Sequence, residues 1–171
     1  LINHVVNALQ VAGLRTPIVV VSPKAETLYA SLGDTVDFVV QEIPLGTGHA
    51  LSRVEGSLNA DTKNVLVING DCPLVTSGSI KRLMESHEEN ESHMSLITTE
   101  SIGQEGYGRI IRDSFGKISE IIEEIDATPE QLGIQELNGG VYAFQVASLW
   151  PQLAKLETSS SREIYLTEMV G

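Results

Sequence analysis

Cysteine and long apolar runs are scarce in this 171-residue sequence. The single cysteine, Cys72, excludes an internal disulfide, and nothing in the sequence calls for an oxidising compartment, so a cytoplasmic location is expected. No apolar run approaches the ~20 residues that an α-helix needs to cross a bilayer. A membrane is therefore not an expected partner.

Basic residues are also few. There are 11 lysines and arginines against 23 aspartates and glutamates, which gives a net charge of -12. Such a charge repels nucleic acid and anionic membranes, so nucleic acid is not an expected partner either. A phosphate-bearing ligand would need local cations, metal ions or backbone N–H groups to offset this field. The four histidines show no zinc-ligand spacing, which favours surface or packing roles.

Strand and helix signals alternate over the first half of the chain. Apolar runs predict buried strands at residues 18–21, 38–41 and 65–68. Apolar spacing and capping residues predict four helices. The first runs from Ile2 to Gly13, and the second begins after an N-cap at Ser22 and runs towards Leu32. The third contains Leu51, Val54 and Leu58, and the fourth is capped by Ser77 and runs to His87. This alternation predicts βαβ units and a mainly parallel sheet within one domain.

The second half has a different character. Strands are predicted at residues 94–99 and 139–144, and residues 109–113 with 117–122 read as an antiparallel hairpin. Shorter helical signals begin at Thr128, at Ala147 (to Leu156) and at Arg162 (to the end). This half is expected to be an α/β insertion that covers one side of the ligand crevice.

The segment after the third strand carries the first candidate site. Asp71 follows the buried run Val65–Ile68, and ligands of open α/β sheets bind at the carboxyl ends of strands. Gly70 permits close backbone approach there. An Asp at this point suits Mg²⁺, which binds through one or two carboxylates together with substrate phosphates. The alternative is that Asp71 merely begins a turn, where Asp and Gly are common.

Four other segments could bind a ligand. The turn Gln41–Ala50 joins a strand to a helix through two glycines and could present backbone N–H groups, or it could simply be a capped helix. The glycines of Gly106–Ile110 would let backbone approach a hydroxyl-rich ligand, although a plain turn is the simpler interpretation. Adjacent Glu123 and Glu124 point to opposite faces of a strand, so at most one enters a given cleft. The amide of Asn138, at the start of a strand, could bind sugar hydroxyls.

These segments occur in one order together with two more, and the full set is Leu45–Ala50, Asn69–Leu74, Gly106–Ile110, Asp126–Thr128, Glu136–Tyr142 and Tyr165–Thr167. The set resembles the uridyltransferase domain of the bacterial bifunctional N-acetylglucosamine-1-phosphate uridyltransferase/glucosamine-1-phosphate acetyltransferase. The resemblance covers nearly the whole chain. It implies a Rossmann-like α/β nucleotidyltransferase fold, with an antiparallel hairpin region over the sugar site.

The resemblance also implies an activity and a site. Uridylyl would pass from UTP to N-acetylglucosamine 1-phosphate, giving UDP-N-acetylglucosamine and pyrophosphate for cell-wall synthesis. Residues 1–93 would form the nucleotide-binding part and 94–171 the sugar-binding part, in a parent protein that could be homo-oligomeric. The residues that match functional positions of the family are Gln41, Gly46 and Thr47 for uracil, Asp71 for Mg²⁺, and Gly108, Glu123 and Asn138 for the sugar.

Departures from the family pattern qualify these expectations. The family's first strand and its glycine-rich loop with an arginine and a lysine have no counterpart here, nor do its asparagine ligand for Mg²⁺ and its acetyltransferase domain. Ile125 stands where the family usually has lysine, and Gly139 where it often has threonine. The chain is thus expected to be a fragment, truncated at both ends, with a gap in its sheet and little activity alone; measurable UTP turnover by these 171 residues would refute this. The alternatives are another sugar-1-phosphate nucleotidyltransferase and a non-catalytic nucleotide-sugar binding module.

Overall fold

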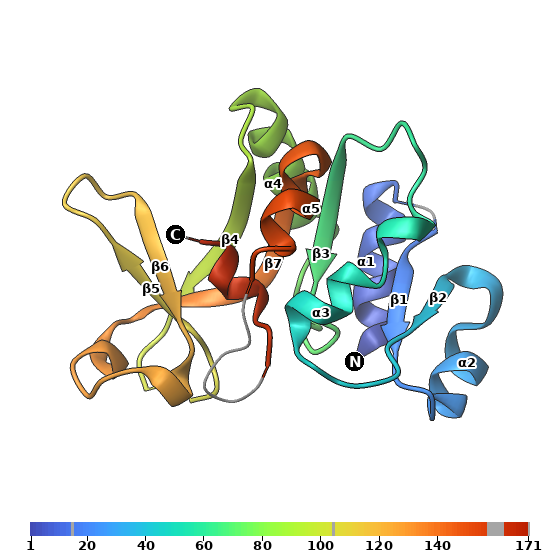
Figure 1. Ribbon diagram of the computed structural model, residues 1–171, viewed down its shortest axis with the longest axis horizontal. Helices are drawn as coiled ribbons and strands as arrows, with labels where there is room; N and C mark the ends of the chain where they lie inside the picture. Colours follow the sequence, from blue (N-terminus) through green and yellow to red (C-terminus); the bar gives the residue numbers. More distant parts are fainter. Residues whose placement is uncertain (15, 104, 157–162, 171) are drawn as a thin grey trace.

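The chain folds as a Rossmann-like α/β structure with mixed sheets (Figure 1). The computed structural model describes residues 1–14, 16–103, 105–156 and 163–170. The strands are β1 (Ile18–Val21), β2 (Asp37–Val40), β3 (Asn64–Ile68), β4 (Met94–Glu100), β5 (Arg109–Arg112), β6 (Ile118–Ile122) and β7 (Glu136–Gln145). The α-helices are α1 (Ile2–Ala12), α2 (Glu26–Leu32), α3 (Thr47–Ser52), α4 (Ser77–Glu89) and α5 (Val146–Leu153). Within this part of the chain, no helix has the length and apolar character needed to cross a membrane.

Helix boundaries differ from the sequence prediction at several places. Helix α1 ends at Gly13 as expected, and its Val6 packs with Leu32 and Val36. Helix α2 begins at Glu26 and not directly after Ser22, since the chain between β1 and the buried Ala25 is irregular. Helix α4 is capped by the Thr76 side chain, which accepts from the Ser79 N–H at 3.1 Å, rather than by Ser77.

Several predicted helices are single 3₁₀ turns instead. The helical signal at Thr128 corresponds to η4 (Gln131–Gly133). The helix expected with Leu51, Val54 and Leu58 is divided, because Leu51 lies in α3 and the chain after it forms only η2 (Glu55–Ser57). The helix expected from Arg162 to Gly171 has both of its ends outside the described residues, and its described part contains only η5 (Leu166–Met169). The remaining 3₁₀ turns are η1 (Gly33–Thr35) and η3 (Glu124–Asp126).

The sheet is divided in two, and most of its pairing is antiparallel. Strands β1 and β2 form a parallel pair, while β3, β4, β5, β6 and β7 form a second, five-stranded sheet. Of the pairings among described residues, only β1 with β2 is parallel, so the expected predominance of parallel strands is wrong for this chain. The prediction assumed that β1, β2 and β3 share one sheet, but β3 pairs with β7, which runs the other way.

Strand β7 organises the larger sheet. It is ten residues long, and Figure 1 shows it crossing the molecule from the β5–β6 hairpin towards α5. Its first residues lie beside β5, its later ones pair with β3, and β4 follows its other edge. The β4 register shifts between Leu96 and Thr98, so that one β4 residue lies opposite residues 139–141. This bulge bends β7 where the two halves of the molecule meet.

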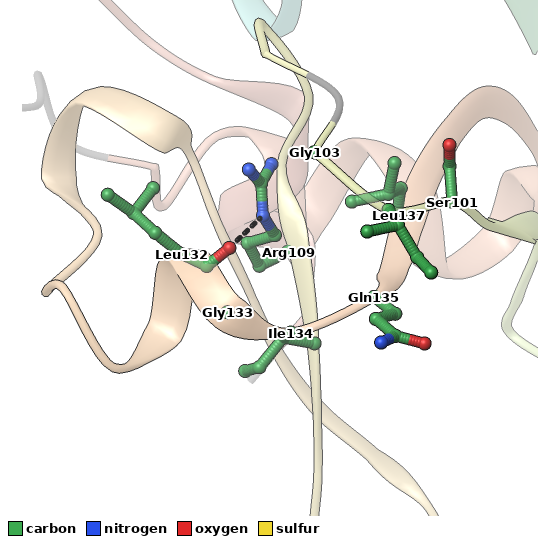
Figure 2. Close-up of a pocket in the computed structure, with 9 residues that line it drawn as sticks. Ser101, Gly103, Arg109, Leu132, Gly133, Ile134, Gln135 and Leu137 are labelled. Carbon is green, nitrogen blue, oxygen red and sulfur yellow. Dashed lines mark hydrogen bonds between the residues drawn. The ribbon is translucent and has the colours of Figure 1, made fainter.

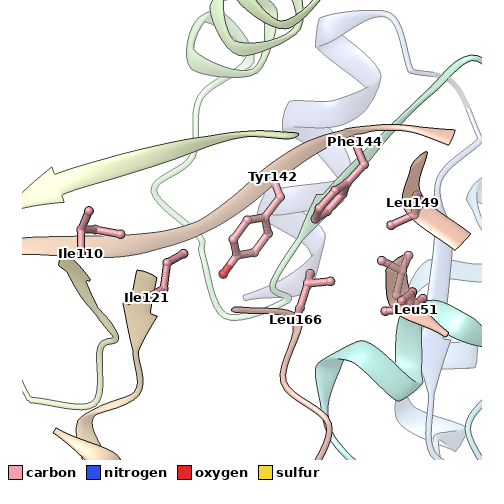
Figure 3. Packing of buried hydrophobic residues seen from close by; sticks show 8 residues of the cluster. Leu51, Ile110, Ile121, Tyr142, Phe144, Leu149 and Leu166 are labelled. Carbon is pink, nitrogen blue, oxygen red and sulfur yellow. The ribbon is translucent and has the colours of Figure 1, made fainter. Parts of the chain in front are cut away.

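The main core lies against β7. Tyr142 and Phe144 are 2% and 0% exposed, and their rings stack at 6.1 Å between centroids (Figure 3). The other buried members of this cluster come from the hairpin, α3, α5 and η5, namely Leu51, Ile110, Ile121, Leu149, Leu153 and Leu166. Since the cluster draws on both halves of the chain, β7 joins them through one apolar core.

Candidate functional site

Asp71 lies in an exposed turn that is fastened to β7. After β3 ends, the Asn69 N–H donates to the Gly140 carbonyl at 2.9 Å, and the Cys72 thiol donates to the Gly139 carbonyl at 3.4 Å. Burial raises the pKa of the Cys72 thiol, and the negative charge of Asp71 raises it further. The thiol therefore stays protonated and holds the turn, while the Asp71 carboxylate is left facing solvent.

Asn138 is buried within β7, not at its start. The strand begins at Glu136 because Leu137 pairs with Arg109 of β5. The Asn138 side chain, 8% exposed, donates from Nδ2 to the Tyr142 hydroxyl at 2.5 Å and accepts at Oδ1 from the Gly140 N–H at 3.1 Å. Burial raises the pKa of Tyr142 to about 12, so its hydroxyl keeps its proton at neutral pH. The Asn138 amide is thus held in one orientation beside the Asp71 turn.

The bulge in β7 requires glycine at position 139. A Cβ atom there would lie 2.6 Å from the Ile97 carbonyl oxygen, which belongs to the backbone of β4 and cannot move aside alone. Any residue with a Cβ atom, threonine included, would clash with this backbone. The close approach of β4 and β7 depends on the missing side chain.

Gly108 directly precedes β5 and Glu123 directly follows β6, so both lie at the same end of the hairpin. The Gly108 carbonyl accepts from the Asn138 N–H at 2.9 Å, and a Cβ on Gly108 would lie 3.5 Å from that of Asn138. Glu123 accepts at Oε1 from the Thr167 hydroxyl at 2.8 Å, whereas Glu124 accepts from the Gly106 N–H. The two glutamates bind separate partners, but they are not strand residues as predicted, because β6 ends at Ile122 and Glu124 begins η3.

The turn with Gln41, Gly46 and Thr47 is hydrogen-bonded to residues 164–166. Helix α3 begins at Thr47, whose Oγ1 accepts from the Leu166 N–H at 2.9 Å. The Gly48 N–H donates to the Ile164 carbonyl at 2.8 Å, so this amide of the turn is satisfied within the protein and is not free for a ligand. Gly46 has φ of 95°, and a Cβ there would lie 2.6 Å from the Ile164 oxygen.

Residues 164–167 connect the two ends of the candidate site. Leu166 bonds Thr47, and the next residue, Thr167, bonds Glu123. No role is predicted for Tyr165–Thr167 from its residue types, and its position in the ordered set of segments is the signal in the sequence that points to it. With the contacts at Asn138 and the pairing of Arg109 with Ile122 in the hairpin, these contacts connect the Asp71 turn to Gly108, Glu123 and Thr47.

A hollow of about 140 Å³ lies beside these contacts (Figure 2). Arg109, which is 4% exposed, lines it and donates from Nε to the Leu132 carbonyl at 3.5 Å. Another hollow, of about 410 Å³, is lined by residues of β4 and η5 together with Ile118. None of the residues predicted for the site lines either of these two hollows.

Within the described part of the chain, Asp71 has no companion acids or histidines that would complete a metal centre. Among the described residues, no group of three or more His, Cys, Asp or Glu side chains is placed to hold a metal ion. A cation at Asp71 would therefore take its remaining ligands from a substrate and from water, which is a common arrangement for Mg²⁺.

Solved structures share this fold. A UDP-glucose pyrophosphorylase complexed with UDP-glucose superposes with a TM-score of 0.77 at 16% identity, covering 98% of this chain and 72% of that one. HddC from Yersinia pseudotuberculosis gives a TM-score of 0.65 at 22% identity, with 97% and 68% covered. At these identities the likeness shows the fold alone.

Sequence comparison gives the family. The protein called bifunctional protein GlmU from Clostridium tetani (strain Massachusetts / E88) is 38% identical over 99% of this chain, and that from Limosilactobacillus fermentum (strain NBRC 3956 / LMG 18251) is 35% identical over 100%. The chain spans 38% of the length of each of these relatives. The profile of the MobA-like NTP transferase domain matches residues 1–168. The chain therefore belongs to the MobA-like NTP transferase domain family.

Proposed function

We propose that the protein carrying this chain is a sugar-1-phosphate nucleotidyltransferase that transfers uridylyl from UTP to N-acetylglucosamine 1-phosphate. The observation that carries the proposal is the series of contacts that joins segments far apart in sequence. Cys72 beside Asp71 bonds Gly139, Asn138 bonds Gly108, and residues 166–167 bond both Thr47 and Glu123. Family membership and the resemblance of the ordered segments support the same reaction.

The parts of the chain would divide the two substrates between them. Residues 1–93 would bind the nucleotide, with Gln41, Gly46 and Thr47 at the uracil, and residues 94–171 would bind the sugar phosphate. Gly108 would let the sugar approach the backbone, and Glu123 would accept from its hydroxyls. Asn138 keeps a second lone pair on Oδ1 and a second N–H on Nδ2 for hydroxyl groups, because each atom makes one bond within the protein.

The carboxylate available at Asp71 fits Mg²⁺. It is exposed, it follows β3 at the carboxyl end, and its neighbours in the turn are held by β7. When bound there with the nucleotide, the ion would offset the charge of the phosphates. The protein's own residues would hold the two substrates so that a phosphate oxygen of the sugar lies in line with the α-phosphorus of UTP. No protein nucleophile is needed, and the protonated Cys72 thiol is unsuited to be one.

A second candidate is a nucleotidyltransferase that uses glucose 1-phosphate. Its support is the fold shared with a UDP-glucose pyrophosphorylase. Pyrophosphate release with UTP, measured with N-acetylglucosamine 1-phosphate and then with glucose 1-phosphate, separates the two reactions. A module that binds UDP-sugars without turning them over would release no pyrophosphate with either.

The proposal is tested by Asp71→Asn in the protein as it occurs naturally, with whatever polypeptide flanks these residues. The control is Asp61→Asn, at an equally exposed aspartate in the loop before β3. We expect Asp71→Asn to lower UTP-dependent pyrophosphate release by about 100-fold or more, as for loss of a group that stabilises charge at the reacting centre, and Asp61→Asn to leave it unchanged. Equal activity of the two variants, or no turnover of UTP by the natural protein, would overturn the proposal.

A further inference from the structure

The side chain of Gln41 is held by two contacts within the candidate site. Its Nε2 lies 3.1 Å from the Gly46 carbonyl oxygen and 2.8 Å from Nδ1 of His49. A carbonyl oxygen only accepts hydrogen bonds, so the NH₂ end of the amide, and not its oxygen, must face Gly46. The orientation of this amide follows from chemistry and not from an arbitrary choice between nitrogen and oxygen.

The same reasoning fixes the state of His49. The amide nitrogen of Gln41 only donates, so Nδ1 of His49 must accept and carries no proton. The imidazole is then neutral, with its proton on Nε2. His49 lies in α3 and Gly46 directly precedes that helix, so one short element sets both contacts.

With both amide hydrogens engaged, Gln41 has only its oxygen left to offer. Within the described part of the chain, Oε1 of the half-buried Gln41 accepts no hydrogen bond. A ligand that reaches this side chain therefore meets an acceptor. Uracil presents a ring N3–H donor between two carbonyl groups, whereas N3 of cytosine is itself an acceptor. A fixed acceptor attracts the first base and repels the second.

We infer that His49 is a positioning residue that sets base selectivity. By taking the second N–H of Gln41, it keeps that side chain an acceptor at the nucleobase and so favours uridine over cytidine nucleotides. Without His49 that N–H would be free to donate to N3 of cytosine. The role rests on the proposed function, because it requires that a nucleobase contacts Gln41.

The test compares three variants in the natural full-length protein, with UTP and CTP as probes. His49→Phe removes the acceptor, His49→Asn replaces it with an amide oxygen near the place of Nδ1, and His4→Phe is the control at an exposed histidine of α1. Calorimetric affinities and the separate values of kcat and KM are measured. We expect His49→Phe to weaken UTP binding about three- to tenfold, as for loss of one neutral hydrogen bond, with CTP binding unchanged or stronger.

His49→Asn should restore most of the preference for UTP, His4→Phe should match the natural protein, and the effect should lie in KM and not in kcat. Equal weakening of UTP and CTP by His49→Phe would mean a merely structural role and would overturn the inference. Undiminished UTP binding would also overturn it. Failure of the natural protein to bind UTP at all would instead refute the proposed function, and this role with it.

The tautomer of His49 gives a readout that does not depend on activity. Long-range ¹H–¹⁵N spectra of the natural protein distinguish a protonated from an unprotonated ring nitrogen. An unprotonated Nδ1 and a protonated Nε2 would support the inference. A proton on Nδ1 at neutral pH would contradict it, whatever the variants do.

Discussion

The two sheets of this molecule are built in different ways. The β1–β2 sheet joins two four-residue strands that are separated by α2, and it packs on a small cluster that includes Val6 and Val36. The sheet around β7 joins strands from residues 64 to 145 and carries the main core. The β1–β2 sheet therefore forms from segments that are close in sequence, whereas the β7 sheet forms only when segments far apart in sequence come together.

The candidate site is shared unequally between them. Gln41 follows β2, while Asp71, Gly108, Glu123 and Asn138 are held by strands of the β7 sheet or by the turns that leave them. Damage to β7 should therefore remove both the fold and the proposed sugar and metal sites. Damage to the small sheet should loosen mainly the nucleotide end.

The largest difference should come from the two cores. Phe144→Ala should lower the free energy of unfolding by about 3–5 kcal/mol, the usual cost of truncating a buried aromatic. Val36→Ala should cost about 2 kcal/mol, because it removes only two buried methyl groups. Urea denaturation followed by circular dichroism measures both. A larger loss for Val36→Ala would show that the small sheet, and not β7, limits stability.

A glycine in each region gives the next contrast. Gly139→Ala places a methyl group 2.6 Å from the Ile97 oxygen and should cost about 2–3 kcal/mol through overpacking. Gly33→Ala meets no atom within 4 Å, but φ of 52° with ψ of −138° is a conformation that only glycine adopts readily, so about 1–3 kcal/mol of backbone strain is expected without a clash. Thermal unfolding of both variants measures the two costs. A cost below about 1 kcal/mol for Gly139→Ala would mean that β4 can move away from the bulge.

Acid sensitivity should also reside on the β7 side. His87 of α4 is 1% exposed, its Nδ1 lies 2.9 Å from the Ser95 hydroxyl, and within the described chain its Nε2 has no partner. Burial lowers the pKa of His87 below its ordinary value of 6.5, an effect that the charge of Glu88 opposes but does not reverse. The unfolded chain therefore binds a proton at a higher pH than the folded chain does. Stability from this group is complete above pH 6.5 and is lost as the pH falls through the folded pKa.

His87→Leu removes this proton uptake and should flatten the dependence of unfolding free energy on pH just below pH 6.5, by at most about 1.4 kcal/mol per pH unit. The control is His4→Leu at an exposed position of α1, which should leave the dependence of unfolding free energy on pH unchanged. The slopes are measured by urea denaturation at several pH values between about 7 and 5, where His87 is expected to take up its proton on unfolding. Identical slopes for all three proteins would rule out His87 as the source.

The smallest effect is expected from surface polar contacts in either region. Arg112 of β5 binds Glu136 of β7 through two contacts of 2.7 and 2.6 Å, with 42% of the arginine side chain exposed. Arg112→Met should cost about 0.2–1 kcal/mol, as for other exposed ion pairs. Asn3→Ala, which breaks the bonds between α1 and Ser31, should fall within the same range. A loss above this range for Arg112→Met would mean that the pair fixes the register of β7.

Sequence patterns predicted most elements because each pattern is local. The apolar runs at 18–21 and 65–68 form β1 and β3, and Gly13 ends α1 as expected. The expected burial of these two strands is wrong, because Val21 is buried but the rest of β1 and all of β3 are only partly buried. The pairing of β3 with β7 and the bulge at Gly139 could not be predicted this way, since they depend on which distant strand offers an edge. The same is true of the bonds from residues 164–167, and of His49, whose value lies in its distance to Gln41.

The proposed site is tested most directly by a crystal structure of the natural protein with UDP-N-acetylglucosamine and Mg²⁺. We expect uracil at Gln41, Gly46 and Thr47, the sugar at Gly108, Glu123 and Asn138, and the cation at Asp71. Binding of the ligand elsewhere, for example in the hollow beside Arg109 with Asp71 and Asn138 untouched, would contradict this expectation.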